Sequence, residues 1–163
     1  MPKASPAMDT CPLGRTIGVL GDWWTLLILR NALLAGQSRF DQFHRNLGIA
    51  TNILTKRLGE LVEAGILERV PSEHPRSRYE YQVTEKGTEL WPVFSALLDW
   101  GNRWSADEAA PPRRLLHDGC GGAIRTATHC SSCSEPLDPE DIYLEPIGGP
   151  APAVTAASSA PQA

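Results

Sequence analysis

Residues 50–83 read ATNILTKRLGELVEAGILERVPSEHPRSRYEYQV, and the change of period within this stretch indicates the fold. Up to residue 64 the apolar side chains recur at the spacing of an amphipathic helix, which Gly65 ends. Residues 66–70 and 79–83 then alternate between apolar and polar like two strands, joined by a long polar hairpin tip. A helix followed directly by such a hairpin predicts a helical domain with a β wing.

Three further helices are predicted before this stretch. A short helix begins at Pro12, a residue suited to a first turn, and the apolar run 23–35 follows Asp22, a suitable N-cap. A third helix covers residues 39–47.

One more helix is predicted after the hairpin, with Thr84 as its N-cap and with Pro92 expected to kink or delay it. The order of four helices, two strands and a last helix is that of a winged helix-turn-helix. We therefore expect a mainly α fold with a small β-hairpin wing, plus a short C-terminal segment that is zinc-ribbon-like.

Composition divides the chain into four parts. Residues 11–104 carry nearly all the apolar periodicity and are the expected DNA-binding and dimerisation domain, and 105–114 form a linker. Residues 115–147 hold three of the four cysteines. Residues 148–163 are rich in Gly, Pro, Ala, Ser and Thr and are expected to be a disordered tail.

The overall composition is that of a globular protein. The 163 residues are 42% hydrophobic and 21% charged, with a net charge of −4. No apolar run reaches the roughly 20 residues of a membrane span, and the N-terminus has no signal-peptide core, so we expect a cytoplasmic protein without a membrane partner. In a reducing compartment, four cysteines favour metal binding or redox chemistry over structural disulfides.

Several short motifs resemble the HxlR-type transcription regulators, relatives of the MarR winged helices. In chain order these are Cys11-Pro12, GDWWTLLILR (21–30), RFDQF (39–43), GIATNILTKRL (48–58), LVEAGIL (61–67) and YEYQVTEKG (79–87). The resemblance covers about Cys11 to Trp104 and implies a homodimeric, operator-binding regulator without enzymatic activity. The family pattern usually has Lys or Arg before the Trp of the second helix, where this chain has Trp23.

The helix 50–64 is the predicted recognition helix because its polar side carries DNA-reading residue types. Asn52 is suited to an adenine edge, Thr55 to a base or phosphate, and Lys56 to guanine or phosphate. Arg57 lies on the flank and either contacts DNA or pairs within the fold. The plain alternative is a solvated amphipathic face.

The hairpin tip is the second predicted contact, with Arg76 at its tip as the best candidate for a phosphate or minor-groove contact. Arg78 either joins it or pairs across the strands with Glu68. Arg39 and Arg45 bracket the third helix, where backbone contacts are expected. The complete set of predicted DNA contacts is Arg39, Thr51, Asn52, Thr55, Lys56, Arg57, His74, Arg76 and Arg78.

The terminal helices are the expected dimer interface, because the last one has more aromatic surface than a small domain needs. The alternative is that these side chains cover the domain's own core. A twofold dimer predicts a pseudo-palindromic operator on double-stranded DNA.

Cys11 is the candidate redox-sensing thiol. A helix N-terminus favours the thiolate, and some members of the resembled family use the cysteine at this position to sense oxidants or electrophiles. The alternative is a half-buried structural thiol.

The C-terminal cysteines have zinc-ligand spacing. His117, Cys120, Cys130 and Cys133 form a His-x-x-Cys…Cys-x-x-Cys set typical of a short zinc ribbon, and His129 competes for the fourth position. A Cys130–Cys133 disulfide and free thiols are the alternatives to structural zinc.

We therefore expect a sequence-specific regulator, a repressor released by a thiol-reactive or small-molecule signal. A protein-interaction module on the same fold is one alternative. A zinc-dependent enzyme is another, although the chain lacks a phosphate loop, a nucleophile elbow and a His-Glu-x-x-His helix.

Overall fold

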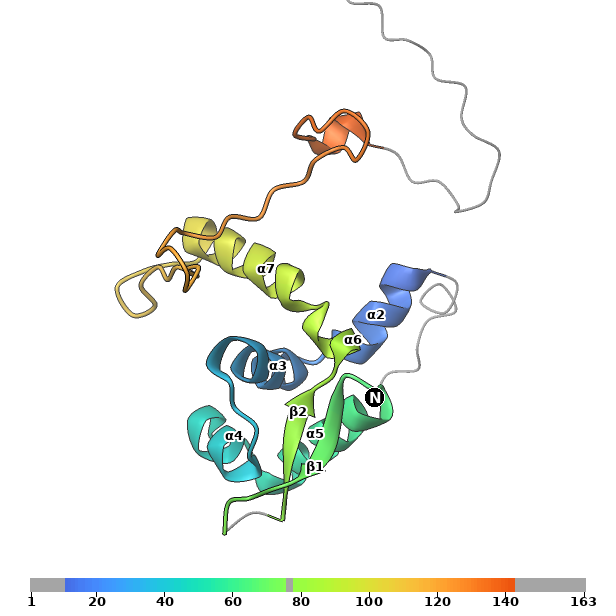
Figure 1. The fold of residues 1–163 in the computed structure, drawn as a ribbon, viewed down its shortest axis with the longest axis vertical. Helices are drawn as coiled ribbons and strands as arrows, with labels where there is room; N and C mark the ends of the chain where they lie inside the picture. Colours follow the sequence, from blue (N-terminus) through green and yellow to red (C-terminus); the bar gives the residue numbers. More distant parts are fainter. Residues whose placement is uncertain (1–10, 76–77, 143–163) are drawn as a thin grey trace, which may run out of the picture. The chain divides into compact units, whose positions relative to one another are not determined.

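The computed structural model describes residues 11–75 and 78–142 (Figure 1). Its elements, in chain order, are α2 (Pro12–Leu20), α3 (Trp23–Ala35), α4 (Phe40–Leu47), α5 (Thr51–Glu63), β1 (Leu67–Pro71), β2 (Tyr79–Val83), α6 (Glu85–Thr88), α7 (Trp91–Trp104) and the 3₁₀ turn η1 (Pro139–Asp141). The predicted mainly α fold with a two-stranded wing is confirmed. The tail predicted for residues 148–163 lies outside the described residues.

The ends of the helices follow from local chemistry, as predicted. The Asp22 carboxylate accepts hydrogen bonds from the amides of Trp24 (3.0 Å) and Thr25 (3.4 Å), which have no partner inside α3. At the other end Gly36 adopts a left-handed conformation, with φ 61°, that a side chain would disfavour.

The last predicted helix is two helices. Thr84 caps α6 by accepting from the Gly87 amide, but α6 ends after one turn and α7 begins at Trp91. Pro92 lies in the first turn of α7, the place where its missing N–H costs nothing. The delay expected from Pro92 is thus confirmed, and a single helix from residue 84 is wrong.

The core forms where α3, α4, α5 and the hairpin meet. Ile28, Phe43 and Leu54 are fully buried there, as are Leu58 and Leu61 on the same side of α5. Because these α5 residues recur at helical spacing, the opposite side of α5 is left to solvent.

The antiparallel hairpin packs beside α5, with Leu67 opposite Val83 and Pro71 opposite Tyr79 (Figure 1). Tyr81 is buried in the core, and its amide donates to the carbonyl of Ser38, just before α4. The wing is therefore fastened both to the core and to the entry of α4.

An ion pair joins α5 to the start of α3. Arg57 donates to the second oxygen of Asp22 at 2.7 Å and to Glu60 at 2.8 Å. The Arg57 side chain is only 14% exposed, so this pair is shielded from solvent. One carboxylate thus caps α3 and fixes the flank of α5.

The chain divides into two compact units between Thr126 and Ala127, and each is described by itself. In the first unit, residues after α7 return to that helix: Asn102 exchanges two hydrogen bonds with the backbone of Arg113, and Thr126 donates to the buried Ser95 hydroxyl at 2.9 Å. The predicted C-terminal segment 115–147 straddles the division.

Among the described residues, no single helix combines the length and apolar character needed to cross a membrane. Only α2 and α3 taken together, with an 85° bend between them, satisfy that test of length and composition.

The Asp22 carboxylate both caps α3 and pairs with Arg57, so its loss should reduce the free energy of unfolding more than the loss of an exposed carboxylate. Asp22→Ala removes the α3 cap and leaves the shielded Arg57 with Glu60, so we expect about 2 kcal/mol less free energy of unfolding in urea titrations. Asp41→Ala, which removes an exposed pairing carboxylate in α4, should cost less than about 1 kcal/mol. Equal losses for the two variants would show that the Asp22 contacts do not stabilise the fold.

Candidate nucleic-acid interface

The solvent side of α5 presents four of the predicted contact residues together. Thr51, Asn52, Thr55 and Lys56 are all exposed, in the N-terminal half of the helix. The Thr55 hydroxyl donates to the Thr51 carbonyl at 2.8 Å and still has lone pairs to accept another bond. The arrangement offers an amide, hydroxyls and an ammonium along one helix face.

The start of α5 also favours an anion. Its N-cap is Ala50, which supplies no side-chain hydrogen bond, so the first amides of the helix have no side-chain cap. The Lys56 side chain is 59% exposed, and its Nζ atom lies 3.9 Å from Glu60 Oε1. This long surface ion pair leaves the charge of Lys56 accessible. Backbone and side chain therefore place positive charge on the same exposed face.

Arg57 is the exception among the predicted α5 contacts. Its guanidinium is engaged by Asp22 and Glu60, and its Nε atom is buried without a hydrogen-bond partner among the described residues. Pairing within the fold, the second role considered for this residue, is the one the structure shows.

The cations of α4 share one carboxylate. Asp41 lies 3.3 Å from Arg39 and 2.8 Å from Arg45. Partial desolvation raises the Asp41 pKa, but the hydrogen bond from Arg39 and the charges of both arginines outweigh it and leave the pKa below its ordinary value. Arg45 is 67% exposed and Arg39 24%, so Arg45 presents more of its guanidinium to solvent.

The tip end of the wing is held by Glu80, a role that the sequence did not reveal. Its two oxygens accept hydrogen bonds from Ser38 and Ser72, each at 2.8 Å. The hydrogen bonds from Ser72 and Ser38 keep the Glu80 pKa below its ordinary value. Glu80 thus connects Ser38, which precedes α4, to Ser72, which directly follows β1.

Arg69 packs against two tyrosines on the hairpin. Its guanidinium carbon lies 5.0 Å from the Tyr79 ring centroid and 5.7 Å from that of Tyr81. Burial, with a contribution from Tyr79, raises the pKa of Tyr81 to about 12. The register places Arg69 opposite Tyr81, so this contact would have followed from the sequence once the register was known.

The hairpin tip holds the remaining predicted contacts. The strand register puts Glu68 opposite Gln82, so the alternative pairing of Arg78 with Glu68 is wrong. Arg78 is exposed, immediately before the start of β2. His74 is half-buried, with its amide donating to Ser72 Oγ at 3.1 Å. Arg76 lies outside the described residues.

Both terminal helices expose apolar side chains. On α7, Val93, Leu97, Trp100 and Trp104 are 47–72% exposed and follow one another at i, i+4, i+7 and i+11. That spacing makes a single stripe, about a quarter turn around the helix from the buried Phe94 and nearly opposite the buried Ser95. On α2 the corresponding exposed residues are Leu13, Ile17 and Val19.

Cys11 occupies the N-cap position of α2. Its backbone is extended, its thiol is free and half-buried, and its side chain makes no capping hydrogen bond.

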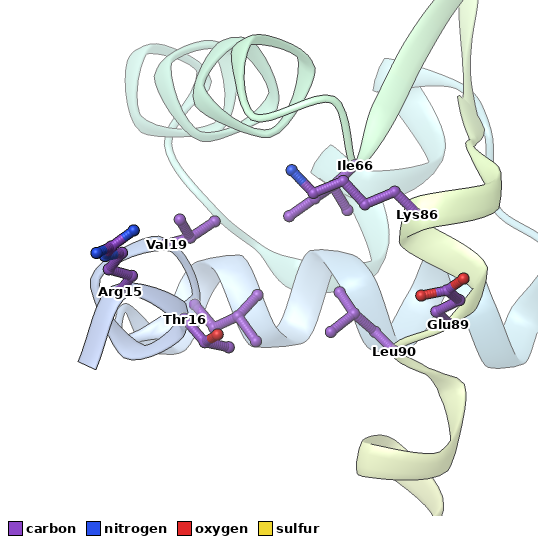
Figure 2. Close-up of a pocket in the computed structure, with 8 residues that line it drawn as sticks. Arg15, Thr16, Val19, Ile66, Lys86, Glu89 and Leu90 are labelled. Atoms are coloured by element: carbon purple, nitrogen blue, oxygen red, sulfur yellow. The ribbon is translucent and has the colours of Figure 1, made fainter. Parts of the chain in front are cut away.

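A pocket of about 400 Å³ lies between α2 and α6 (Figure 2). Its lining combines apolar side chains, such as those of Leu20, Ile66 and Leu90, with charged ones. The lining residues are Arg15, Thr16, Val19, Leu20, Ile66, Lys86, Glu89 and Leu90.

The predicted metal ligands occur as two pairs. His117 Nδ1 lies 3.3 Å from Cys120 Sγ in the first unit. In the second unit, hydrogen bonds from the Cys133 and Ser132 amides lower the pKa of Cys130. Across residues 11–75 and 78–142, no three His, Cys, Asp or Glu side chains are grouped in a way that could hold a metal ion.

Comparison with known proteins shows the family. The sequence profile of the HxlR-like helix-turn-helix matches residues 19–109. The chain belongs to the HxlR-like helix-turn-helix family. It is therefore a helix-turn-helix transcriptional regulator.

Relatives of this HxlR-like chain also span its C-terminal part. The HTH-type transcriptional regulator Rv3095 of Mycobacterium tuberculosis is 38% identical over 137 residues, or 84% of this chain and 86% of the relative. The crystal structure of PA1607, named as a candidate transcription factor, superposes with a TM-score of 0.75 at 36% identity, covering 83% of this chain and 94% of that one. Matches of this length extend beyond residue 104.

A third comparison concerns redox regulation. The reduced form of the redox regulator HypR has a TM-score of 0.51 to the HxlR-like chain at 31% identity, covering 58% of this chain and 95% of that one.

Proposed function

We propose that this regulator is a homodimer that binds a pseudo-palindromic operator through α5 and the wing and represses transcription until a signal releases it. The observation that carries the proposal is the exposed row Asn52, Thr55 and Lys56 on a helix whose opposite face is fully buried. The protein acts by binding, and no catalytic step is part of the proposal.

The fixed orientation of α5 is what makes base reading feasible. A side chain discriminates bases only if its helix is held in register with the groove, and α5 is held by Leu54 and Leu58 in the core and by the Arg57–Asp22 pair. Asn52 then reaches an adenine edge, and Lys56 a guanine edge or phosphate.

Electrostatics favour this face in spite of the acidic total. From Arg39 to Arg57 the chain carries four cations and one acid. Arg45 at the end of α4 and Arg78 at the base of the wing tip are both exposed and flank α5 in the sequence. These cations are positioned to contact phosphates, which fix orientation without reading sequence.

The apolar stripe of α7 is the proposed dimer interface. Trp100 and Trp104 are 58% and 72% exposed, and side chains of this size rarely stand in solvent as a continuous row. A second copy would cover the stripe in both subunits at once, because a twofold contact is self-complementary. The two recognition helices would then address two half-sites.

Helix α2 is the proposed receiver of the signal. Cys11 lies at its N-cap, and four lining residues of the 400 Å³ pocket belong to the same helix. HypR, a redox regulator of similar fold, supports thiol chemistry as the leading signal, with a small molecule in the pocket as the second. Either event would change the position of α2.

The first prediction concerns DNA reading. In fluorescence anisotropy on DNA from upstream of its own gene, Asn52→Ala should cost about 1–3 kcal/mol per half-site, with little effect on unrelated DNA. Lys56→Ala should lower the salt slope by about one per protomer, whereas the control Arg103→Ala, which removes an exposed cation from α7, should not. Losses that are equal for the two variants would contradict the assignment of α5.

The second prediction concerns the dimer. Leu97→Glu places a charge in the α7 stripe, so light scattering should show a monomer with operator affinity at least about tenfold weaker. Arg103→Glu introduces the same side chain at an exposed α7 position outside the stripe and should stay dimeric. A dimeric Leu97→Glu protein would place the interface elsewhere.

The third prediction concerns the signal. The thiol oxidant diamide should weaken operator binding about 5–150-fold, the usual range of allosteric coupling, and Cys11→Ser should bind DNA but ignore the oxidant. Cys130→Ser, which keeps Cys11, should respond like the unaltered chain. If Cys11→Ser still releases DNA, Cys11 is not the sensor.

A further inference from the structure

The pocket between α2 and α6 has the composition of a small-molecule site. Its volume of about 400 Å³ falls within the range of ligand pockets, which are lined mainly by apolar side chains with a few polar groups. Val19, Leu20, Ile66 and Leu90 supply the apolar part of the lining. The described residues that line the pocket all belong to the first compact unit, so their mutual placement is defined.

The charged side chains give the lining a net positive charge. Arg15 and Lys86 are cationic, and Glu89 is the one carboxylate among the described lining residues. Figure 2 shows Lys86 extending from α6 toward α2, whereas Glu89 stays on the α6 side, beside Leu90. Two cations and one acid favour an anionic ligand over a cationic one.

Lys86 is the lining cation whose ammonium has a defined position. Its Nζ atom donates to the Ala64 carbonyl at 2.7 Å. An ammonium group has three N–H donors, and this bond uses one of them. A carboxylate binds an ammonium more strongly than a neutral acceptor does, because both partners are charged. The chemistry of this end of the pocket therefore matches a carboxylate.

The same lysine connects the pocket to the end of α5. Ala64 is the C-cap of that helix, so the Lys86 ammonium lies at the negative end of the helix dipole, where a cation is stabilising. Gly87 lets α6 lie directly on the turn that follows α5, because a Cβ there would clash with the Ile66 carbonyl. A molecule that binds Lys86 therefore acts on the C-terminal end of α5.

We propose that this pocket binds a small amphipathic anion, a carboxylate on an apolar chain. Lys86 holds the carboxylate, and the apolar chain lies against Ile66 and Leu90. The inference rests on the proposed function, in which a signal releases the operator, and it names the chemical class of the small-molecule signal. The bound carboxylate competes with the Ala64 carbonyl for the Lys86 ammonium and so weakens the stabilisation of the end of α5.

The test compares three probes with similar tails, octanoate, octanol and octylammonium, by isothermal titration calorimetry of the full-length protein without DNA. We expect octanoate to bind at least about tenfold more tightly than the other two, because a hydrogen bond between charged groups is stronger than a neutral one. Lys86→Met should weaken octanoate binding by at least about tenfold and remove this preference. Arg103→Met, the matched control, removes an exposed cation from α7 and should bind octanoate as the unaltered chain does.

A second variant tests the pocket independently of charge. Val19 lines the pocket from α2 and is 45% exposed, so Val19→Trp fills part of the pocket without replacing a buried side chain. This variant should weaken octanoate binding by at least about tenfold, because the added ring occupies the space of the ligand. Leu13→Trp, at an exposed α2 position that is not among the lining residues, should leave octanoate binding unchanged.

Three results would overturn the proposal. They are octanol or octylammonium binding as tightly as octanoate, unchanged octanoate affinity in Lys86→Met, and unchanged octanoate affinity in Val19→Trp. These measurements contain no DNA, so their failure is distinct from a failure of operator binding. In anisotropy with operator DNA, saturating octanoate should weaken binding by about 5–150-fold. Unchanged operator affinity in a chain that binds octanoate would overturn the release step.

Discussion

The Asp22 carboxylate is the contact on which the DNA-binding surface depends. One oxygen closes the N-terminus of α3, and the other holds Arg57 on the flank of α5 at 2.7 Å. Leu54 and Leu58, both fully buried, anchor the inner side of the same helix, so the core and the ion pair hold α5 from two sides. Its outer row of polar side chains is therefore presented in one orientation, which is what sequence reading requires.

The wing is positioned by a second polar junction, built on Glu80. Glu80 joins Ser38, before α4, to Ser72, which directly follows β1 at the tip end of the hairpin. Buried Tyr81 attaches the same strand as Glu80 to the core. The helix-turn-helix and the wing are thus joined by hydrogen bonds as well as by the core. Helix α2 and the apolar stripe of α7 lie outside these two junctions. In the proposed dimer, movement of α2 or α7 would change the spacing of the half-sites while the contacts that hold α5 stay in place.

The sequence predicted what local chemistry decides and missed what tertiary contacts decide. The Asp22 cap, the Gly36 end and the strand 79–83 follow from neighbouring residues and were predicted with their limits. The pairing of Arg57 with Asp22 joins residues 35 positions apart, so it stayed one of two alternatives. The Glu80 bridge was not foreseen, because its serines become neighbours only when β2 packs against the entry of α4.

The central claim is that the solvent side of α5 reads DNA. The most direct test is an NMR titration of the full-length protein with a duplex from upstream of its own gene and with an unrelated duplex. We predict that the specific duplex shifts the amides and side chains of Thr51, Asn52, Thr55 and Lys56 most, with smaller shifts in the wing. Shifts that spare α5, or that are the same for both duplexes, would contradict the account.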